Sequence, residues 1–136
     1  MTYTLFAVQQ AVYNALAAST DVQGLLGNPP RVYDHVPPGV VFPYVAFGAV
    51  VAKPYDDSDR TGLEQTVTLD IWSRYRGSKE AKDILQSLYD TLHRANLTVT
   101  GEVFLSCEFS GADLTPEADG LTYNAKAHFD VITQSS

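Results

Sequence analysis

Residues 64–73 read EQTVTLDIWS, and from Thr66 to Ile71 polar and apolar side chains alternate. In an extended chain Val67, Leu69 and Ile71 point to one face. The opposite face carries a mixed, largely polar set: Thr66, Thr68, Asp70 and Trp72. A period of two is typical of a β-strand that buries one face, so this segment predicts the centre of a sheet with one covered side.

The segment before this strand is also expected to be extended. Residues 44–51 (YVAFGAVV) are rich in β-branched and aromatic side chains, which favour strands. The intervening residues 53–63 (KPYDDSDRTGL) are polar, so the two strands should form a long hairpin with an acidic tip. We single out six residues of this tip for contacts in assembly or with a channel: Lys53, Tyr55, Asp56, Asp57, Asp59 and Arg60.

Helical periodicity appears on both sides of this hairpin. Apolar residues recur at spacings of three and four over residues 4–19 and again over residues 78–94, where Ser78 is expected to cap the helix through its hydroxyl. Further strands are predicted at residues 31–36, 102–110 and 121–133. In the segment 102–110, Leu105 and Cys107 are expected to share a buried face.

The order of predicted elements is helix, three strands, helix, two strands. This order favours a single α+β domain over residues 1–136, with a mostly antiparallel sheet and two helices packed on one face.

Composition excludes several classes of function. The 136 residues include 9 Lys and Arg against 16 Asp and Glu, a formal net charge of −7. Tight sequence-independent binding of nucleic acid, and docking on anionic lipid, both need clustered basic side chains. No apolar run is long enough to span a membrane, and the amino-terminal segment lacks the features of a signal peptide. These observations predict an acidic, soluble, intracellular domain.

No catalytic or metal-binding pattern stands out. His35, His93 and His128 do not have zinc-ligand spacing, and the single cysteine, Cys107, lies in a predicted strand where a buried apolar role is expected. The acidic tip lacks the arrangement of a calcium loop, and no glycine-rich phosphate loop is present. We therefore expect neither enzymatic activity nor a cofactor or metal, and keep a small-ligand-binding α+β domain as the alternative from another class.

The strands are long relative to the helices that must cover them. An uncovered sheet face or edge of this kind predicts self-association or docking. The candidate interface residues lie on the predicted polar faces of two strands: Thr66, Thr68, Asp70, Trp72, Lys126, His128 and Asp130.

The ordered set of short segments resembles a known family. The segments are residues 5–27 (LFAVQQAVYNALAASTDVQGLLG), 32–37 (VYDHVP), 42–48 (FPYVAFG), 77–81 (GSKEA), 95–99 (ANLTV) and 119–123 (DGLTY), with a final VIT at 131–133. In this order and spacing they resemble the tail completion proteins, also called tail terminators or tail-to-head joining proteins. Such proteins occur in long-tailed bacteriophages and in related prophage or gene-transfer particles.

The resemblance implies a structural virion protein made in the host cytoplasm. It implies a ring of identical subunits, a hexamer, at the head-proximal end of the tail tube, where it ends tube polymerisation and offers the head-to-tail joining surface. The expected partners are further copies of the chain, the tail tube protein and head connector proteins. Genomic DNA would pass through the ring without tight binding. The alternative within this class is a head-side connector or neck protein.

Overall fold

The alternating segment forms the middle strand of a five-stranded sheet in a computed structural model, which describes residues 4–135. The strands are β1 (Val32–Tyr33), β2 (Tyr44–Pro54), β3 (Gly62–Ser73), β4 (Glu102–Pro116) and β5 (Tyr123–Ser135), in the spatial order β1-β2-β3-β5-β4. The short β1 runs parallel to β2, and every other pairing is antiparallel. The mostly antiparallel α+β fold predicted from the sequence is confirmed.

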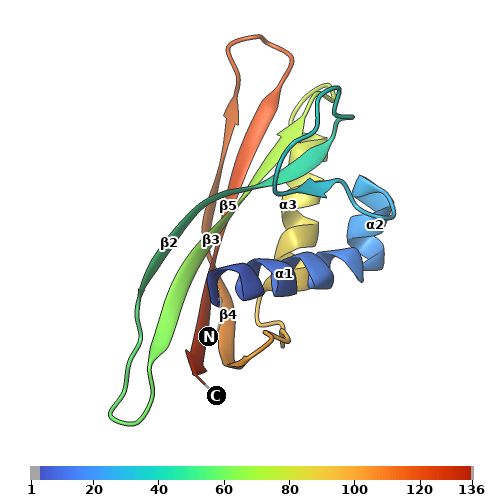
Figure 1. The fold of residues 1–136 in the computed structure, drawn as a ribbon. Coiled ribbons are helices and arrows are strands. Elements are labelled where there is room, and N and C mark those ends of the chain that lie inside the picture. Colours follow the sequence, from blue (N-terminus) through green and yellow to red (C-terminus); the bar gives the residue numbers. More distant parts are fainter. Residues whose placement is uncertain (1–3, 136) are drawn as a thin grey trace.

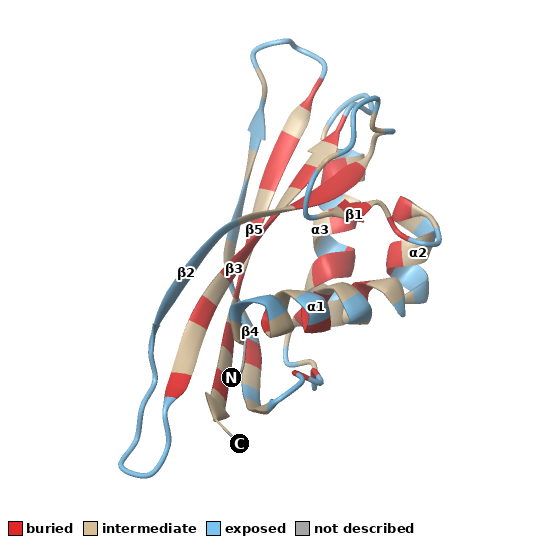
Figure 2. Ribbon diagram, viewed as in Figure 1, coloured by how far each residue is buried: buried red, intermediate tan, exposed pale blue. Residues whose placement is uncertain are grey.

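Three helices lie on one side of this sheet: α1 (Thr4–Ala17), α2 (Thr20–Leu26) and α3 (Lys79–Leu92) (Figure 1). Their apolar faces meet the side chains of β3 and β5 in one core, which includes Leu16, Leu88, Leu69 and Phe129. The buried residues in Figure 2 concentrate between the helices and the middle strands. The tips of the β2–β3 and β4–β5 hairpins extend beyond the helices at opposite ends of the sheet and are exposed (Figures 1 and 2).

The prediction of two helices was wrong because the first helical region divides. The chain leaves α1 at Ala17, and Ser19 adopts an extended conformation and accepts a hydrogen bond from Val22 N at 3.3 Å. This side-chain cap starts the separate helix α2. Ser78 is the N-cap of α3, but within residues 4–135 its side chain makes no capping hydrogen bond.

The predicted burial of Leu105 beside Cys107 was also wrong. A β-bulge between Phe104 and Ser106 inserts an extra residue into β4 and changes the alternation of its side chains. Phe104 therefore packs against the core, while Leu105 is 43% exposed. The strand also continues to Pro116, well past the predicted end at residue 110.

Two polar side chains, Gln65 and Thr133, are buried on the helix side of the sheet. Gln65 is 1% exposed and Thr133 is fully buried, yet neither the Gln65 amide nor the Thr133 hydroxyl makes a hydrogen bond with any residue that the structure describes. They are diagonal neighbours, because Gln65 lies opposite Val131 and Thr133 lies opposite Leu63. An unpaired buried polar group lowers stability, so this part of the sheet is less stable than its burial suggests.

We expect the substitution Thr133→Val to stabilise the protein by about 1 kcal/mol, because it replaces an unpaired buried hydroxyl with a methyl group of similar size. The matched control is Thr68→Val, which removes a hydroxyl that lies 2.9 Å from His128 Nδ1 and should destabilise by about the same amount. Chemical denaturation of both variants measures the free energy of unfolding. A Thr133→Val variant less stable than the wild type would contradict the assignment.

Candidate functional site

The side of the sheet that carries no helix presents a ladder of polar side chains. Thr66 Oγ1 donates to Asp130 Oδ1 at 2.6 Å, and Thr68 Oγ1 lies 2.9 Å from His128 Nδ1. Lys126 Nζ donates to Asp70 Oδ1 at 2.8 Å and forms an ion pair with it. The structure thus brings six of the seven predicted interface residues together in three cross-strand pairs.

These pairs follow from the register of β3 and β5. Thr66 lies opposite Asp130, Thr68 opposite His128 and Asp70 opposite Lys126, so each polar residue meets its partner directly. The seventh residue, Trp72, lies opposite Asn124 at one end of the ladder. The interface role of these residues stays a prediction, but their polar groups already bond to one another, as is typical of a surface that faces water.

Gly48 on β2 makes room for this ladder. A Cβ atom at Gly48 would lie 2.8 Å from Asp70 Oδ2, too close for an ordinary contact. A glycine at this position therefore allows the Asp70 carboxylate to sit beside the β2 backbone while it binds Lys126.

The helix-free face is acidic. β4 adds carboxylates to it, because Glu108 lies opposite Asp130 and Asp113 lies opposite Lys126. Glu64, which lies opposite Lys53, and Asp70 are on the same face. The carboxylates of this face therefore outnumber its two lysines, Lys53 and Lys126. A surface of this charge repels phosphate groups rather than binding them.

The predicted acidic tip is an ordered turn between β2 and β3. Asp57 Oδ1 accepts from the backbone N of Asp59 and of Arg60, each at 2.8 Å, and Asp57 Oδ2 accepts from Gln134 Nε2 at 3.0 Å. Asp56 Oδ1 accepts from Gly62 N at 2.9 Å. These bonds shape the loop while leaving all of residues 55–61 exposed.

The charged side chains of the tip have different partners. Hydrogen bonds from the backbone of Asp59, and then of Arg60, hold the pKa of Asp57 below its usual range. Lys53 pairs weakly with Glu64 on the neighbouring strand, at 3.6 Å. The Tyr55 side chain is 45% exposed, so the tip presents an aromatic ring beside its carboxylates.

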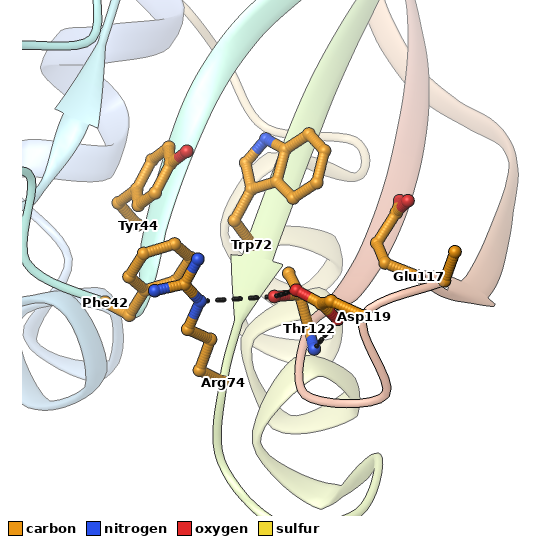
Figure 3. Close-up of a pocket in the computed structure, with 8 residues that line it drawn as sticks. Phe42, Tyr44, Trp72, Arg74, Glu117, Asp119 and Thr122 are labelled. Carbon is orange, nitrogen blue, oxygen red and sulfur yellow. Dashed lines mark hydrogen bonds between the residues drawn. The ribbon is translucent and has the colours of Figure 1, made fainter.

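A pocket of about 390 Å³ that the sequence did not indicate lies at the other end of β2 and β3 (Figure 3). Its lining includes Phe42, Tyr44, Trp72, Arg74, Glu117, Asp119 and Thr122. The Arg74 guanidinium lies 4.2 Å from the Phe42 ring centroid, and Arg74 Nε donates to Thr122 Oγ1 at 3.2 Å. Since Arg74 is already engaged within the chain, the pocket offers mainly an aromatic wall and the carboxylate of Glu117.

Asp119 organises the loop that lines one side of this pocket. Its carboxylate accepts from Leu121 N at 2.8 Å, from Thr122 N at 2.9 Å and from Thr122 Oγ1 at 2.7 Å. These hydrogen bonds lower the pKa of Asp119, and the bond from the Leu121 backbone has the largest effect. Across the pocket, burial raises the pKa of the Tyr44 hydroxyl, and the nearby Arg74 charge opposes that rise.

The remaining candidates for chemistry have structural surroundings. Burial, with the nearby Asp130 and Glu108 charges, raises the pKa of Cys107 to about 12, so the thiol stays protonated. His93 Nδ1 accepts from Phe109 N at 3.0 Å, and the His93 ring stacks on Tyr89. Over residues 4–135, no cluster of three or more His, Cys, Asp or Glu side chains could hold a metal ion.

Among the helices in the same range, none has the length and apolar character to cross a membrane.

Comparison with known proteins gives a consistent result. The profile of the family described as tail completion protein gp17 matches residues 10–134. A chain from a structure titled "Virion of native gene transfer agent (GTA) particle" superposes with a TM-score of 0.90 at 23% sequence identity, covering 99% of this chain and 100% of that one. At this identity the likeness shows a shared fold. A search of curated proteins found no match.

Replacing Asp57 with alanine should loosen the tip, because the amides of Asp59 and Arg60 lose their acceptor. Asp59→Ala is the control, since the Asp59 carboxylate accepts no hydrogen bond within the described chain. Protection of the amides of residues 59 and 60 from hydrogen exchange should fall in Asp57→Ala and stay unchanged in Asp59→Ala. Equal loss in both variants would show that the Asp57 bonds do not order the tip.

The same amides report a pH dependence in the unmodified protein. Because folding lowers the pKa of Asp57, its ionised form stabilises the turn at and above the usual carboxyl range. The stabilisation is lost as the pH falls through the lowered pKa. Protection at residues 59 and 60, corrected for intrinsic exchange at each pH, should therefore decline on acidification in the wild type and stay low throughout in Asp57→Ala.

Proposed function

This chain belongs to the family of the tail completion protein gp17, and from that premise we propose that it closes the head-proximal end of a tail tube as a ring. The chain is a structural component of a phage-type tail and is located in the virion. We propose further that the ring is a hexamer, that it ends tube polymerisation and offers the head-to-tail joining surface, and that it acts without catalysis or a cofactor.

The observation that carries this proposal is the contrast between the two faces of the sheet. One face is buried under three helices, and the other is an acidic, internally bonded ladder that none of the helices in residues 4–135 covers. In a ring around a DNA path, such a face suits the inner wall. Its carboxylates repel the phosphate backbone, so the genome passes without being held.

The tip of the β2–β3 hairpin suits an end-on contact with the tail tube. It extends beyond the helices and combines an exposed aromatic ring, Tyr55, with the Asp56, Asp57 and Asp59 carboxylates and the Arg60 guanidinium. Aromatic and arginine side chains are the ones enriched at protein interfaces. The tail tube protein and the head connector proteins are the partners that we propose for the two ends of the ring.

The alternative function, binding of a small ligand, would use the pocket around Trp72 and Arg74. The lining is aromatic on one side but has little free polar capacity, because Arg74 and Asp119 are both bonded to Thr122. Ligand sites are usually lined by apolar groups with a few unengaged polar groups that fix orientation. The pocket therefore favours a contact between proteins over a dedicated ligand site.

Deletion of the gene from a particle-producing strain should leave overlong or unjoined tails beside filled heads in electron micrographs. Tails of normal length with leaking heads would instead place the protein on the head side of the joint, as a connector or neck protein. Intact particles in normal number would contradict the proposed function altogether.

The triple substitution Asp56→Asn, Asp57→Asn and Asp59→Asn should lower the yield of infectious or DNA-transferring particles roughly tenfold, equivalent to about 1.4 kcal/mol of contact energy. Asparagine keeps one side-chain oxygen to accept the loop's backbone hydrogen bonds, so the substitution removes the charges and, at position 57, the bond from Gln134 to the second oxygen. The matched control removes three charges between α2 and α3: Asp21→Asn, Asp83→Asn and Asp90→Asn. Normal yield from the tip variant, or equal loss in the control, would exclude a specific role for the tip.

A further inference from the structure

Each outer strand of the sheet leaves a short stretch of backbone unpaired at one end. On one side, β1 covers β2 only at Val45 and Ala46, so residues 50–54 form an open edge. On the other side, the middle of β4 is covered, because Arg94 N donates to Cys107 O at 2.7 Å and His93 Nδ1 accepts from Phe109 N at 3.0 Å. Residues 112–116 of β4 lie beyond this cover.

The pattern of hydrogen bonds shows which groups point outward. Tyr55 N donates to Gly62 O, and inward and outward residues alternate along an antiparallel strand. Val50 and Ala52 therefore direct their N–H and C=O groups away from β3. The bond from Glu117 N to Thr122 O assigns Ala112 and Leu114 to the outer edge of β4 in the same way. Across the described chain, no hydrogen bond reaches these outward groups.

We propose that these two open edges pair with each other between neighbouring copies of this chain. Residues 50–54 of one copy would add to residues 112–116 of the next as an antiparallel extension of the sheet, with Ala52 opposite Leu114. This inference deepens the proposed ring and rests on it, since it names the contact that closes the ring.

The strand directions and faces of the two edges agree with this pairing. Since β2, β3, β5 and β4 alternate in direction, β4 of one copy lies antiparallel to β2 of a neighbour rotated about a ring axis. Ala52 and Leu114 both lie on the helix side of their sheets, because they are opposite Gln65 and Ala125. The extended sheet would therefore keep all helices on one side and the acidic ladder on the other.

The side chains opposite each other in this register are complementary. Lys53 would face Asp113, and both lie on the helix-free face. Val51, which is 65% exposed, would face Thr115, a pair of β-branched residues. Opposite charges and β-branched pairs each contribute about 0.2–1 kcal/mol across strands.

The pairing is short, and this limits premature assembly. Pro54 and Pro116 lie at the ends of the two open edges and have no N–H to donate, so they restrict the number of bonds that each contact forms. A two-stranded contact of this length is marginal by itself. We therefore expect the ring to close on the tail, where its subunits are concentrated, rather than in dilute solution.

The dimensions of the resulting ring fit a channel. Six copies, each with four long strands at a spacing of about 4.8 Å, give a circumference of roughly 115 Å before strand tilt widens it. The opening of such a ring is wider than a DNA duplex, and its inner wall would be the acidic helix-free face.

Cysteine cross-linking in assembled particles tests the pairing. In the variant Val51→Cys with Thr115→Cys, the proposed register places the two Cα atoms about 4.5 Å apart, within disulfide range. Within one copy the two positions lie on strands that are three spacings, about 14 Å, apart. They also lie toward opposite ends of the sheet, since Val51 is level with Glu108 of β4, so they cannot bond. The native Cys107 is buried and does not compete.

Mild oxidation of particles carrying this variant should give a ladder of cross-linked multimers that ends at the size of the closed ring. The matched control is Val51→Cys with Val103→Cys, which moves the second cysteine to the far end of β4, and it should give no ladder. Normal particles without cross-links in the first variant, or with equal cross-links in the control, would overturn the pairing while leaving the proposed function intact.

Charge reversal covers the case in which the cysteine variant does not assemble. Lys53→Asp alone should reduce particle yield, and the exchange Lys53→Asp with Asp113→Lys should restore it at least severalfold. If the double exchange yields no more particles than the single substitution, the register is wrong. If deletion of the gene leaves the particles intact, the proposed function itself fails. That result can be distinguished from a failure of the cross-linking or of the charge exchange, which contradicts only the pairing.

Discussion

The structure depends on the antiparallel pairing of β3 with β5. Their register joins twelve residue pairs from Gly62–Gln134 to Ser73–Tyr123 without interruption. Because side chains alternate between faces, this pairing assigns Val67, Leu69 and Phe129 to the core at the same time as it assigns Thr66, Thr68 and Asp130 to the opposite side. A slip of one residue would bury the polar ladder and expose the core, so the register determines both faces together.

The two faces then have different consequences for function. On the buried face, the three helices enclose a single core, and the unpaired groups of Gln65 and Thr133 show that its packing is imperfect at one end. On the helix-free face, the ion pair between Lys126 and Asp70 and the hydroxyl bonds beside it satisfy the polar groups without any partner chain. A face whose polar groups are already hydrogen-bonded is suited to water or to a passing polyanion more than to a dry interface. Contacts between subunits are therefore expected at the edges of the sheet.

The outer strands differ from the middle ones because part of their backbone has an open edge. Loop residues 93–94 cover the middle of β4, and β1 covers the start of β2, which protects most of the sheet from uncontrolled pairing. Among the described residues, the projecting ends of two hairpins stay open, at opposite ends and on opposite edges of the sheet. Different surfaces on the two sides of a subunit produce a head-to-tail contact, and a contact of this type closes into a ring when its rotation allows.

The sequence alone determined the type of most elements, the alternating faces of β3 and β5, the acidic hairpin tip and the resemblance to tail completion proteins, because periodicity and turn residues are local properties of the chain. It did not reveal the break between α1 and α2, the bulge that exposes Leu105, or the extension of β4 to Pro116, since each depends on hydrogen bonds or packing formed across the fold. Only the tertiary structure decided which polar residues meet across the sheet, which edges stay open, and that Phe42, Arg74 and Asp119 line one pocket. These features join segments far apart in the chain, and the register that brings them together is a long-range choice that no local pattern encodes.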